Sequence, residues 1–348
     1  MSGEWCNFPS RVTHHSPLFP LPAIPSKLTF VTPLHLGPTA VTRARDFLGS
    51  YRLARLIRVG NTTAVWEAIK TGDPTRYALK ILRDDLRKDK AEITALKHEF
   101  EVGRKLKHKN VIHIYEFNTE GSTPYLVLEL FECPNLKLLL RQGVKTLAYL
   151  TPRIIEQSAE ALFYMHEEGW IHRDVKPDNF LVNDDGLVKL IDFAISDKYR
   201  KGIGGLFTFR SKVQGTRSYM SPEQIRGRAL DPRSDLYSFG CMLFELVSGK
   251  MPFTGTTADE LLIKHLSAPI PPLGVFNENV TPEFSKLVTR LMQKKKEDRP
   301  DSMWEFVKEF RAMRVYKIMP KIPEGKIVLP REVSASIDDL KKGGPKGG

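Results

Sequence analysis

The sequence predicts an α+β protein with a small N-terminal antiparallel sheet carrying one helix, followed by a larger, mainly helical part. Two observations predict this class. Between residues 51 and 131, short apolar or alternating runs are separated by turn signals, as in an antiparallel meander. Beyond residue 135, apolar residues recur at spacings of three and four, the period of helices that bury one face. A cluster of polar residues at 172–179 lies between two of these helical stretches and marks a chemical site.

Five strands and one helix are expected in the N-terminal part. The strands are expected at 51–57, 63–69, 76–82, 112–117 and 125–129, and the charged helix at about 91–107. Thr71-Gly72-Asp73-Pro74 is a turn signal between the second and third strands. The segment therefore predicts a five-stranded sheet with one helix.

The second part is expected to hold helices near 152–168, 234–248, 258–266, 282–293 and 302–316. Thr151-Pro152 and Asp301-Ser302 are typical helix starts, and Gly169 and Gly249 are typical stops. The polar cluster and two short strands are expected between the first two helices.

Both ends of the chain differ in composition from its centre. Residues 1–46 hold seven prolines, which disfavour helices and central strands, so we expect an extended, disordered arm there. A featureless leader is the simpler interpretation of this arm, and a proline-rich docking ligand is the alternative. Residues 319–348 are rich in Lys, Gly and Pro and are expected to form a basic, disordered tail.

The overall composition excludes several classes of protein. Hydrophobic residues make up 41% of the chain and charged residues 27%, which is ordinary for a folded protein. The net charge of +12 is diffuse, and no basic helix or RNA-binding aromatic strand stands out, so nucleic-acid binding is not expected. Three scattered cysteines give no disulfide or zinc pattern and favour a reducing, cytoplasmic setting. Neither a membrane span nor a secretory signal is expected.

The most informative stretch is His172-Arg173-Asp174-Val175-Lys176-Pro177-Asp178-Asn179. It places an acid, a cation and a carboxamide within six positions, and Asp192 follows the apolar run 187–191. An Asp can accept a hydroxyl proton, while an Asn and a second Asp offer the oxygen ligands that Mg²⁺ prefers. A charged surface turn is the alternative interpretation, but it does not explain this spacing.

These motifs, with Gly215-Thr216-Arg217-Ser218-Tyr219-Met220-Ser221-Pro222-Glu223-Gln224, resemble those of eukaryotic-like (Hanks-type) serine/threonine protein kinases, in particular bacterial ones. The resemblance covers about residues 51–310. It implies a two-lobed kinase fold over 51–315, with an N-lobe at 51–131 and a C-lobe at 132–315. It also implies transfer of the γ-phosphoryl group of ATP to Ser or Thr hydroxyls of protein substrates, with Mg²⁺ or Mn²⁺.

The resemblance assigns a role to each matching residue of the phosphotransfer centre. Asp174 would be the base, Lys176 would neutralise the transferred phosphoryl group, and Thr216 would bond the base. Lys80 would hold the α- and β-phosphates and pair with Glu99, since Glu101 would point to another face of its helix. Asn179 and Asp192 would bind the metal.

The same resemblance implies an adenine pocket and three structural residues. The expected nucleotide-binding residues are Gly60, Val65, Ala78, Lys80, Leu128, Glu129, Phe131 and Leu181. Leu128 matches the gatekeeper, and Glu129 and Phe131 match the hinge residues. Asp235, Glu223 and Arg299 would be structural: the first would anchor the catalytic loop, and Arg299 resembles a late ion-pair partner in Glu-Asp-Arg-Pro.

Three departures from the family pattern stand out. Of the three glycines of the phosphate loop only Gly60 remains, because Arg58 and Thr63 occupy the other two positions, which predicts a stiffer flap and weaker nucleotide binding. Ala194 follows Asp192-Phe193 in place of glycine, which predicts an activation segment that flips less readily. Gly103 stands where an apolar side chain would pack toward Phe193, which predicts a less firmly held helix.

These departures leave two other functions open. The eroded glycine loop favours a pseudokinase scaffold with weak or no phosphotransfer, whereas the presence of every charged residue of the centre favours an active enzyme. A small-molecule phosphotransferase is disfavoured by the long activation segment. We also expect activation by autophosphorylation at Thr208 or Ser211, whose phosphate would pair with Arg173 and with Lys198 or Arg200. Plain loop hydroxyls are the alternative.

Overall fold

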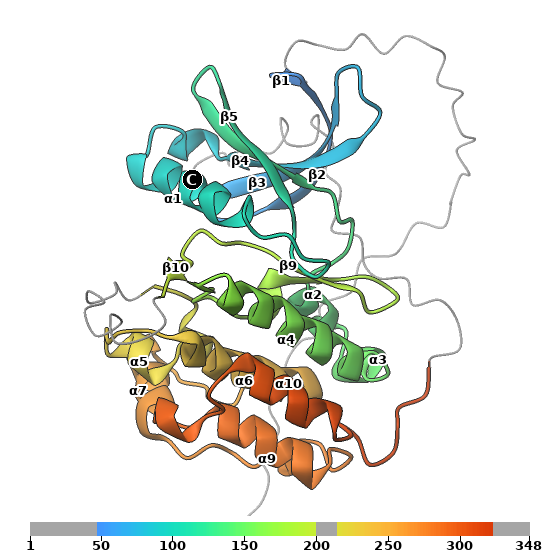
Figure 1. Cartoon of the computed structure of the whole chain (residues 1–348), viewed down its shortest axis with the longest axis vertical. Coiled ribbons are helices and arrows are strands. Elements are labelled where there is room, and N and C mark those ends of the chain that lie inside the picture. Colours follow the sequence, from blue (N-terminus) through green and yellow to red (C-terminus); the bar gives the residue numbers. More distant parts are fainter. Residues whose placement is uncertain (1–46, 200–213, 323–348) are drawn as a thin grey trace, which may run out of the picture. The chain divides into compact units, whose positions relative to one another are not determined.

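The structure, a computed structural model, describes residues 47–199 and 214–322 of the chain. Its N-terminal part is a six-stranded antiparallel sheet with the strand order β1-β2-β3-β4-β6-β5 (Figure 1). The strands are β1 (Phe47–Leu48), β2 (Tyr51–Val59), β3 (Thr63–Lys70), β4 (Arg76–Leu82), β5 (Ile114–Glu120) and β6 (Thr123–Glu129). The prediction of five strands omitted only the two-residue β1, which pairs with β2.

Helix α1 (Lys90–Gly103) follows β4 and precedes β5 in the chain, and it packs against β5 and β6 of the sheet (Figure 1). It begins after Asp89, whose side chain accepts hydrogen bonds from the amides of Ala91 and Glu92. The expected helix at 91–107 was therefore correct in place but too long at its end. The buried face of α1 includes Leu96, Glu99 and Val102, so one turn of the helix presents a carboxylate to the interior.

The second part is mainly helical and confirms the predicted α+β class. Its helices are α2 (Leu136–Arg141), α3 (Val144–Leu147), α4 (Thr151–Glu167), α5 (Pro222–Ile225), α6 (Pro232–Ser248), α7 (Ala258–Ser267), α8 (Leu273–Phe276), α9 (Pro282–Leu291) and α10 (Met303–Arg311). Its short strands are β7 (Trp170–Ile171), β8 (Phe180–Val182), β9 (Val188–Leu190) and β10 (Asp197–Lys198). The last helix ends five residues earlier than the expected 302–316.

Helix α6 is the centre of this part, with all residues from Ser234 to Val247 buried. It begins after Asp231, which caps the first turn, and ends at Gly249, whose φ of 71° is left-handed. The helices α4, α9 and α10 pack around α6 (Figure 1). These packed helices hold Asp235, which lies in the first turn of α6, next to the polar cluster at 172–179.

Alternation along β4 separates two faces of the sheet. Leu79 and Ile81 pack into one small core with Tyr51, Ala68 and Val127. Ala78 and Lys80 point to the opposite face, because successive strand residues alternate, and there Ala78 joins the main core. Lys80 is thus held on a rigid central strand facing the helical part. The predicted arm and tail lie almost wholly outside the described residues.

Candidate active site

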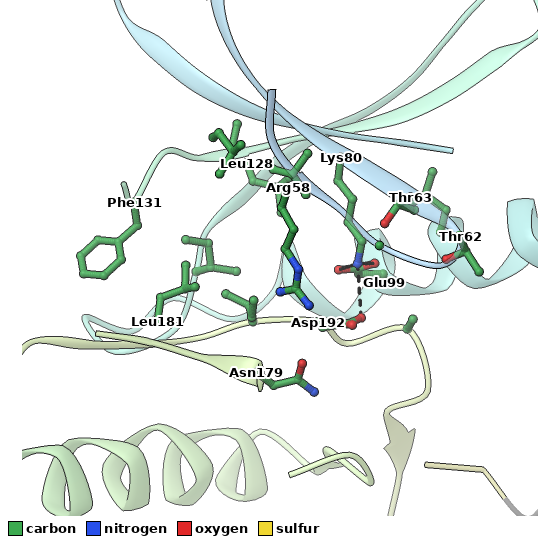
Figure 2. A pocket seen from close by; sticks show the side chains of 18 of the residues that line it. Arg58, Thr62, Thr63, Lys80, Glu99, Leu128, Phe131, Asn179, Leu181 and Asp192 are labelled. Carbon is green, nitrogen blue, oxygen red and sulfur yellow. Dashed lines mark hydrogen bonds and ion pairs between the residues drawn. The ribbon is translucent and has the colours of Figure 1, made fainter. Parts of the chain in front are cut away.

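A cavity of about 410 Å³ lies between the sheet and the helical part, and Figure 2 shows its lining. All of the residues expected to bind nucleotide line it: Gly60, Val65, Ala78, Lys80, Leu128, Glu129, Phe131 and Leu181. Val65 and Ala78 come from β3 and β4, and Leu181 comes from β8. Leu128 stands opposite Ala78 in the β4–β6 pairing. The cavity thus has apolar walls from both parts of the protein, a form that suits a flat heterocycle.

The Lys80 ammonium is fixed by two carboxylates at the back of this cavity (Figure 2). Its Nζ lies 2.8 and 2.7 Å from the two carboxylate oxygens of Glu99 and 3.3 Å from Oδ1 of Asp192. The structure therefore brings together a strand, helix α1 and the segment after β9 through one cation. Glu101 is exposed and instead pairs with Arg104, in agreement with the predicted choice of Glu99.

Charge and burial together set the protonation of this cluster. Burial lowers the pKa of Lys80, but the carboxylates of Asp192 and Glu99 outweigh it and raise that pKa above its usual value. Burial raises the pKa of Asp192, yet the charge of Lys80 overcomes it and lowers that pKa to about 2. Burial also raises the pKa of Glu99, and the Lys80 ammonium opposes that rise. Lys80 and Asp192 are consequently both charged at neutral pH.

The side chain of Ile114, on β5, fills the space beside Gly103 that a larger helix residue would otherwise occupy. A Cβ atom at Gly103 would lie 2.4 Å from Cδ1 of Ile114 and 3.2 Å from Cδ2 of Phe193. Ile114 and Phe193 are both fully buried. The expectation that Gly103 leaves helix α1 less firmly held is therefore wrong, because Ile114 occupies the space that a larger residue on the helix would fill.

This packing predicts a stability difference between two helical glycines. We expect Gly103→Ala to lower the free energy of unfolding by roughly 1–3 kcal/mol relative to Gly274→Ala, because the added methyl group overpacks the core. Gly274 is the matched control, since no atom lies within 4 Å of its would-be Cβ. Urea unfolding monitored by circular dichroism measures the difference. Equal effects of the two substitutions would show that the Ile114 side chain yields without cost.

Backbone strain sits at Asp192, the residue before Phe193. Its φ is 69°, and Arg173 (φ 70°) is the other residue besides glycine with a positive φ among those described. Left-handed backbone in such residues is sparsely populated and concentrates at functional sites. In this conformation Ala194 has no positive φ, so alanine at that position costs no backbone strain here.

The polar cluster at 172–179 forms a closed network with Thr216. Oδ1 of Asp174 accepts hydrogen bonds from the amide and the hydroxyl of Thr216, each at 2.9 Å. Nζ of Lys176 lies 2.6 Å from Oδ2 of Asp174 and donates to Oγ1 of Thr216 at 2.7 Å. The predicted contact of Thr216 with the residue at position 174 is therefore present, and it joins two segments that lie 42 residues apart in the chain.

Asn179 links this network to the cavity. Its Nδ2 donates to the backbone carbonyl of Asp174 at 2.8 Å and to Oδ2 of Asp174 at 3.2 Å. Since both amide protons are directed to Asp174, the amide oxygen is the atom left for a ligand. Asn179 and Asp192 both line the cavity, where they offer two hard oxygen donors of the kind that Mg²⁺ takes.

A metal at this place would need more ligands than the protein offers. Within residues 47–199 and 214–322, no group of three or more His, Cys, Asp or Glu side chains could hold a metal ion. Mg²⁺ is commonly bound by one or two protein oxygens together with substrate phosphates and waters. The donor set therefore fits a divalent cation that arrives with a phosphorylated ligand.

Asp235 anchors the backbone of the polar cluster from below. Its carboxylate accepts from the amides of His172 and Arg173 at 2.8 and 2.9 Å and contacts Nε2 of His166 at 2.8 Å. These bonds support the left-handed Arg173, whose carbonyl also accepts from Nε2 of Gln224 at 2.8 Å. The structural role predicted for Asp235 is confirmed, and the strained turn is held from both α6 and α5.

Glu223 and Arg299 form the buried ion pair at the end of the activation segment. Nη1 and Nη2 of Arg299 lie 2.7 and 3.0 Å from the carboxylate oxygens of Glu223, a bidentate arrangement. Ser221 caps helix α5 in a capping box with Gln224. The structural assignment of Arg299 is therefore confirmed.

Some lining residues escaped the sequence analysis or received the wrong role there. Ile57 and Ile112 line the cavity, whereas the sequence pattern predicts only that they lie in strands. Arg58 was interpreted as a residue that stiffens a loop, yet its side chain points into the cavity (Figure 2). The strand pattern alone gave no signal for Arg58, because a bulge between Leu56 and Arg58 shifts the alternation of β2.

No helix in the described part of the chain is long and apolar enough to cross a membrane. Thr208, Ser211 and Arg200, which were expected to take part in regulation, lie outside the described residues.

Comparison with known proteins identifies the family. Serine/threonine-protein kinase PknA of Mycobacterium tuberculosis is 36% identical over 65% of this chain and 53% of its own length. Serine/threonine-protein kinase PknL of the same species is 32% identical over 68% of this chain and 59% of its own length. A Clostridium acetobutylicum protein named as a probable serine/threonine-protein kinase is 30% identical over 76% of this chain and 40% of its own length.

The chain thus spans about half the length of the curated relatives that it matches. The family model of the protein kinase domain matches residues 51–310. These residues include strands β2–β6 of the sheet, the cavity lining and the polar network described above. The chain therefore belongs to the protein kinase domain family.

Proposed function

We propose that this protein is a serine/threonine protein kinase that transfers the γ-phosphoryl group of ATP to hydroxyls of protein substrates. The observation that carries the proposal is the joint geometry of Lys80, Asp192 and Asn179 in one cavity, with Asn179 bonded to Asp174. In this proposal Lys80 is the phosphate-binding cation of the site, Asn179 and Asp192 supply the metal-binding oxygens, and the neighbouring Asp174 is the proton acceptor. That set is what phosphoryl transfer requires.

Each residue has a distinct part in this proposal. Lys80, oriented by Glu99, holds the α- and β-phosphates as a fixed point charge. Asp174 accepts the hydroxyl proton and orients the hydroxyl, and Lys176 offsets the charge of the moving phosphoryl group. Asn179 and Asp192 would hold Mg²⁺, or Mn²⁺ in its place, and such a cation would neutralise charge on the phosphate oxygens.

The adenine would lie between the apolar walls. Val65 and Ala78 cover one face and Leu181 the other, and Leu128 closes the back. Glu129 and Phe131 follow each other closely at the end of β6 and would present backbone groups to the base edge. The side chain of Glu129 is neutralised by Lys189, whose Nζ lies 2.7 Å from its Oε1, so it does not repel an anion in the cavity.

One assay tests the proposal against its two alternatives. Purified protein is incubated with labelled ATP and Mg²⁺ or Mn²⁺, with a generic protein acceptor in one arm and small hydroxylated metabolites in the other. Label on protein Ser or Thr supports the proposal. Label on the metabolites alone would indicate a small-molecule phosphotransferase. Binding of ATP without transfer to either acceptor would indicate the pseudokinase scaffold that the altered glycine loop favours.

We also propose autophosphorylation at Thr208 or Ser211 as the activating step. Arg173 would receive the phosphate: it is buried, and its Nη1 lies 3.5 Å from Oδ2 of Asp197, at the start of the segment that leads to these hydroxyls. A phosphate carries more charge than the Asp197 carboxylate and would compete for this guanidinium.

We expect ATP-treated protein to carry phosphate on Thr208 or Ser211, and the double Ala variant to lose most of its activity. Phosphopeptide mapping and initial rates measure the two effects. Thr256→Ala, on an exposed hydroxyl near α7, is the control. Full activity of wild-type protein that carries no phosphate at either position would contradict activation by autophosphorylation.

A further inference from the structure

Arg58 occupies an unusual place in the cavity. It is the last residue but one of β2 and pairs with Val65 of β3. The bulge before it turns its side chain inward, so that the guanidinium points into the cavity toward the side where Asp192 and Asn179 lie (Figure 2). The sheet, which forms the roof of the cavity, thus contributes a second cation to the site through β2.

Most of the charged residues that line the cavity already have partners in the part of the chain that the structure describes, but Arg58 does not. Arg58 and Lys80 are its basic lining residues, and Glu92, Glu99, Glu129 and Asp192 its acidic ones. Lys80 is already engaged by Glu99 and Asp192, and Glu129 by Lys189. Among the residues that the structure describes, Arg58 forms no salt bridge and no side-chain hydrogen bond. Its guanidinium, which carries five N–H donors, therefore points into the cavity and has no hydrogen-bond acceptor among the described residues.

The turn next to Arg58 also presents polar side chains to the cavity. Gly60 donates to the carbonyl of Thr63 at 2.8 Å, which closes a tight β2–β3 turn. Thr62 and Thr63 line the cavity beside it (Figure 2). Where glycines would let backbone amides approach a phosphate closely, this turn instead offers side-chain donors.

We propose that Arg58 binds the phosphates of the nucleotide, from the roof of the cavity, while Lys80 binds them from the back. A guanidinium presents a planar fork that matches two phosphate oxygens. It thereby adds a side-chain contact to phosphate in a turn where Arg58 and Thr63, unlike glycine, carry side chains that hinder a close approach of the backbone amides. This inference rests on the proposed function, because it takes ATP as the ligand. It also reverses the sequence-based expectation that Arg58 weakens nucleotide binding.

The test compares ligands that differ only in phosphate. Isothermal titration measures the binding of adenosine, of ADP with Mg²⁺ and of ATP with Mg²⁺ to wild-type protein, Arg58→Met and Arg58→Lys. We expect Arg58→Met to raise the Kd for ATP about tenfold, since hydrogen bonds to a charged group are lost. The Kd for adenosine should change less than about twofold, and Arg58→Lys, which keeps the charge but not the fork, should lie between.

Arg52→Met is the matched control, because Arg52 lies on the same strand but is exposed and does not line the cavity. Equal ATP binding by Arg58→Met and wild type overturns the inference and leaves the kinase proposal intact. Tighter ATP binding by Arg58→Met also overturns it, because Arg58 would then obstruct the site. An equal loss for adenosine and ATP would mean that Arg58 packs against the base. Wild-type protein that binds none of the three ligands would overturn the proposed function itself.

Discussion

Asp174→Asn is expected to lower kcat for phosphotransfer by about 10²–10⁴-fold, the contribution typical of a positioned general base. The substitution keeps the size and shape of the side chain but removes the carboxylate that accepts from Thr216 and pairs with Lys176. Asp174 is not among the residues that line the cavity, so ATP affinity should stay close to that of the wild type. The loss should therefore fall on kcat and not on nucleotide binding.

Initial rates with labelled ATP and a protein acceptor measure this effect, and thermal unfolding confirms that the variant is folded. Asp185→Asn, in the exposed turn between β8 and β9, is the matched control and should keep full activity. Lys80→Met, purified in the same way, should also be inactive and reveals any contaminating kinase. If Asp174→Asn turned over near the wild-type rate while Lys80→Met showed no activity, Asp174 would not be the base.

Arg299→Met is expected to lower the free energy of unfolding by roughly 3–5 kcal/mol at neutral pH, the cost of breaking a buried ion pair. The side chain of Arg299 is 0% exposed and that of Glu223 is 7% exposed, so water cannot replace the lost partner. Arg299 also donates to the carbonyls of Gln293 and Arg233 at 2.8 and 2.7 Å. A further bond goes to the carbonyl of Lys294 at 3.4 Å, so the substitution leaves the Glu223 carboxylate and three backbone carbonyls without this donor.

The deficit should depend on pH in a defined direction. Burial raises the pKa of Glu223, but the Arg299 guanidinium outweighs it and lowers that pKa below its usual value. The pair therefore stabilises the wild type above the unfolded-state pKa of Glu, about 4.3, and this contribution is lost as the pH falls. Without Arg299, burial of Glu223 is opposed only by the hydrogen bonds from Ser234 and from the backbone, so the pKa of Glu223 should be higher in the variant than in the wild type. The difference in stability between wild type and variant should thus shrink from pH 7 toward pH 4.

Urea unfolding at pH 7 and at pH 4 measures both effects. Arg311→Met is the control, because Arg311 pairs with Glu156 and Glu160 while its side chain is 46% exposed. Exposed pairs of this kind contribute about 0–1 kcal/mol. A loss for Arg299→Met no larger than that for Arg311→Met would show that the Glu223–Arg299 pair does not hold the end of the activation segment.

Local patterns predicted the longer strands of the sheet and the longer helices, but not the short helices α2, α3, α5 and α8. The strand predicted at 76–82 coincides with β4, and the stop predicted at Gly249 is right because this residue ends helix α6 with a left-handed backbone. The ends of α1 and α10 were placed too late, because apolar residues beyond Gly103 and Arg311 continue into buried turns and strands that have no helical backbone. Strand β1 was missed because two residues carry no period.

The chemical groups of the site can be identified without any contact, from the spacing of Asp174, Lys176, Asn179 and Asp192 together with Lys80 and Glu99. Two features depend on how the chain packs. Ile114 fills the space beside Gly103, and Arg58 points into the cavity. The physical reason is that packing and direction depend on partners distant in the chain and on a strand bulge, and neither leaves a trace in the period of a single segment.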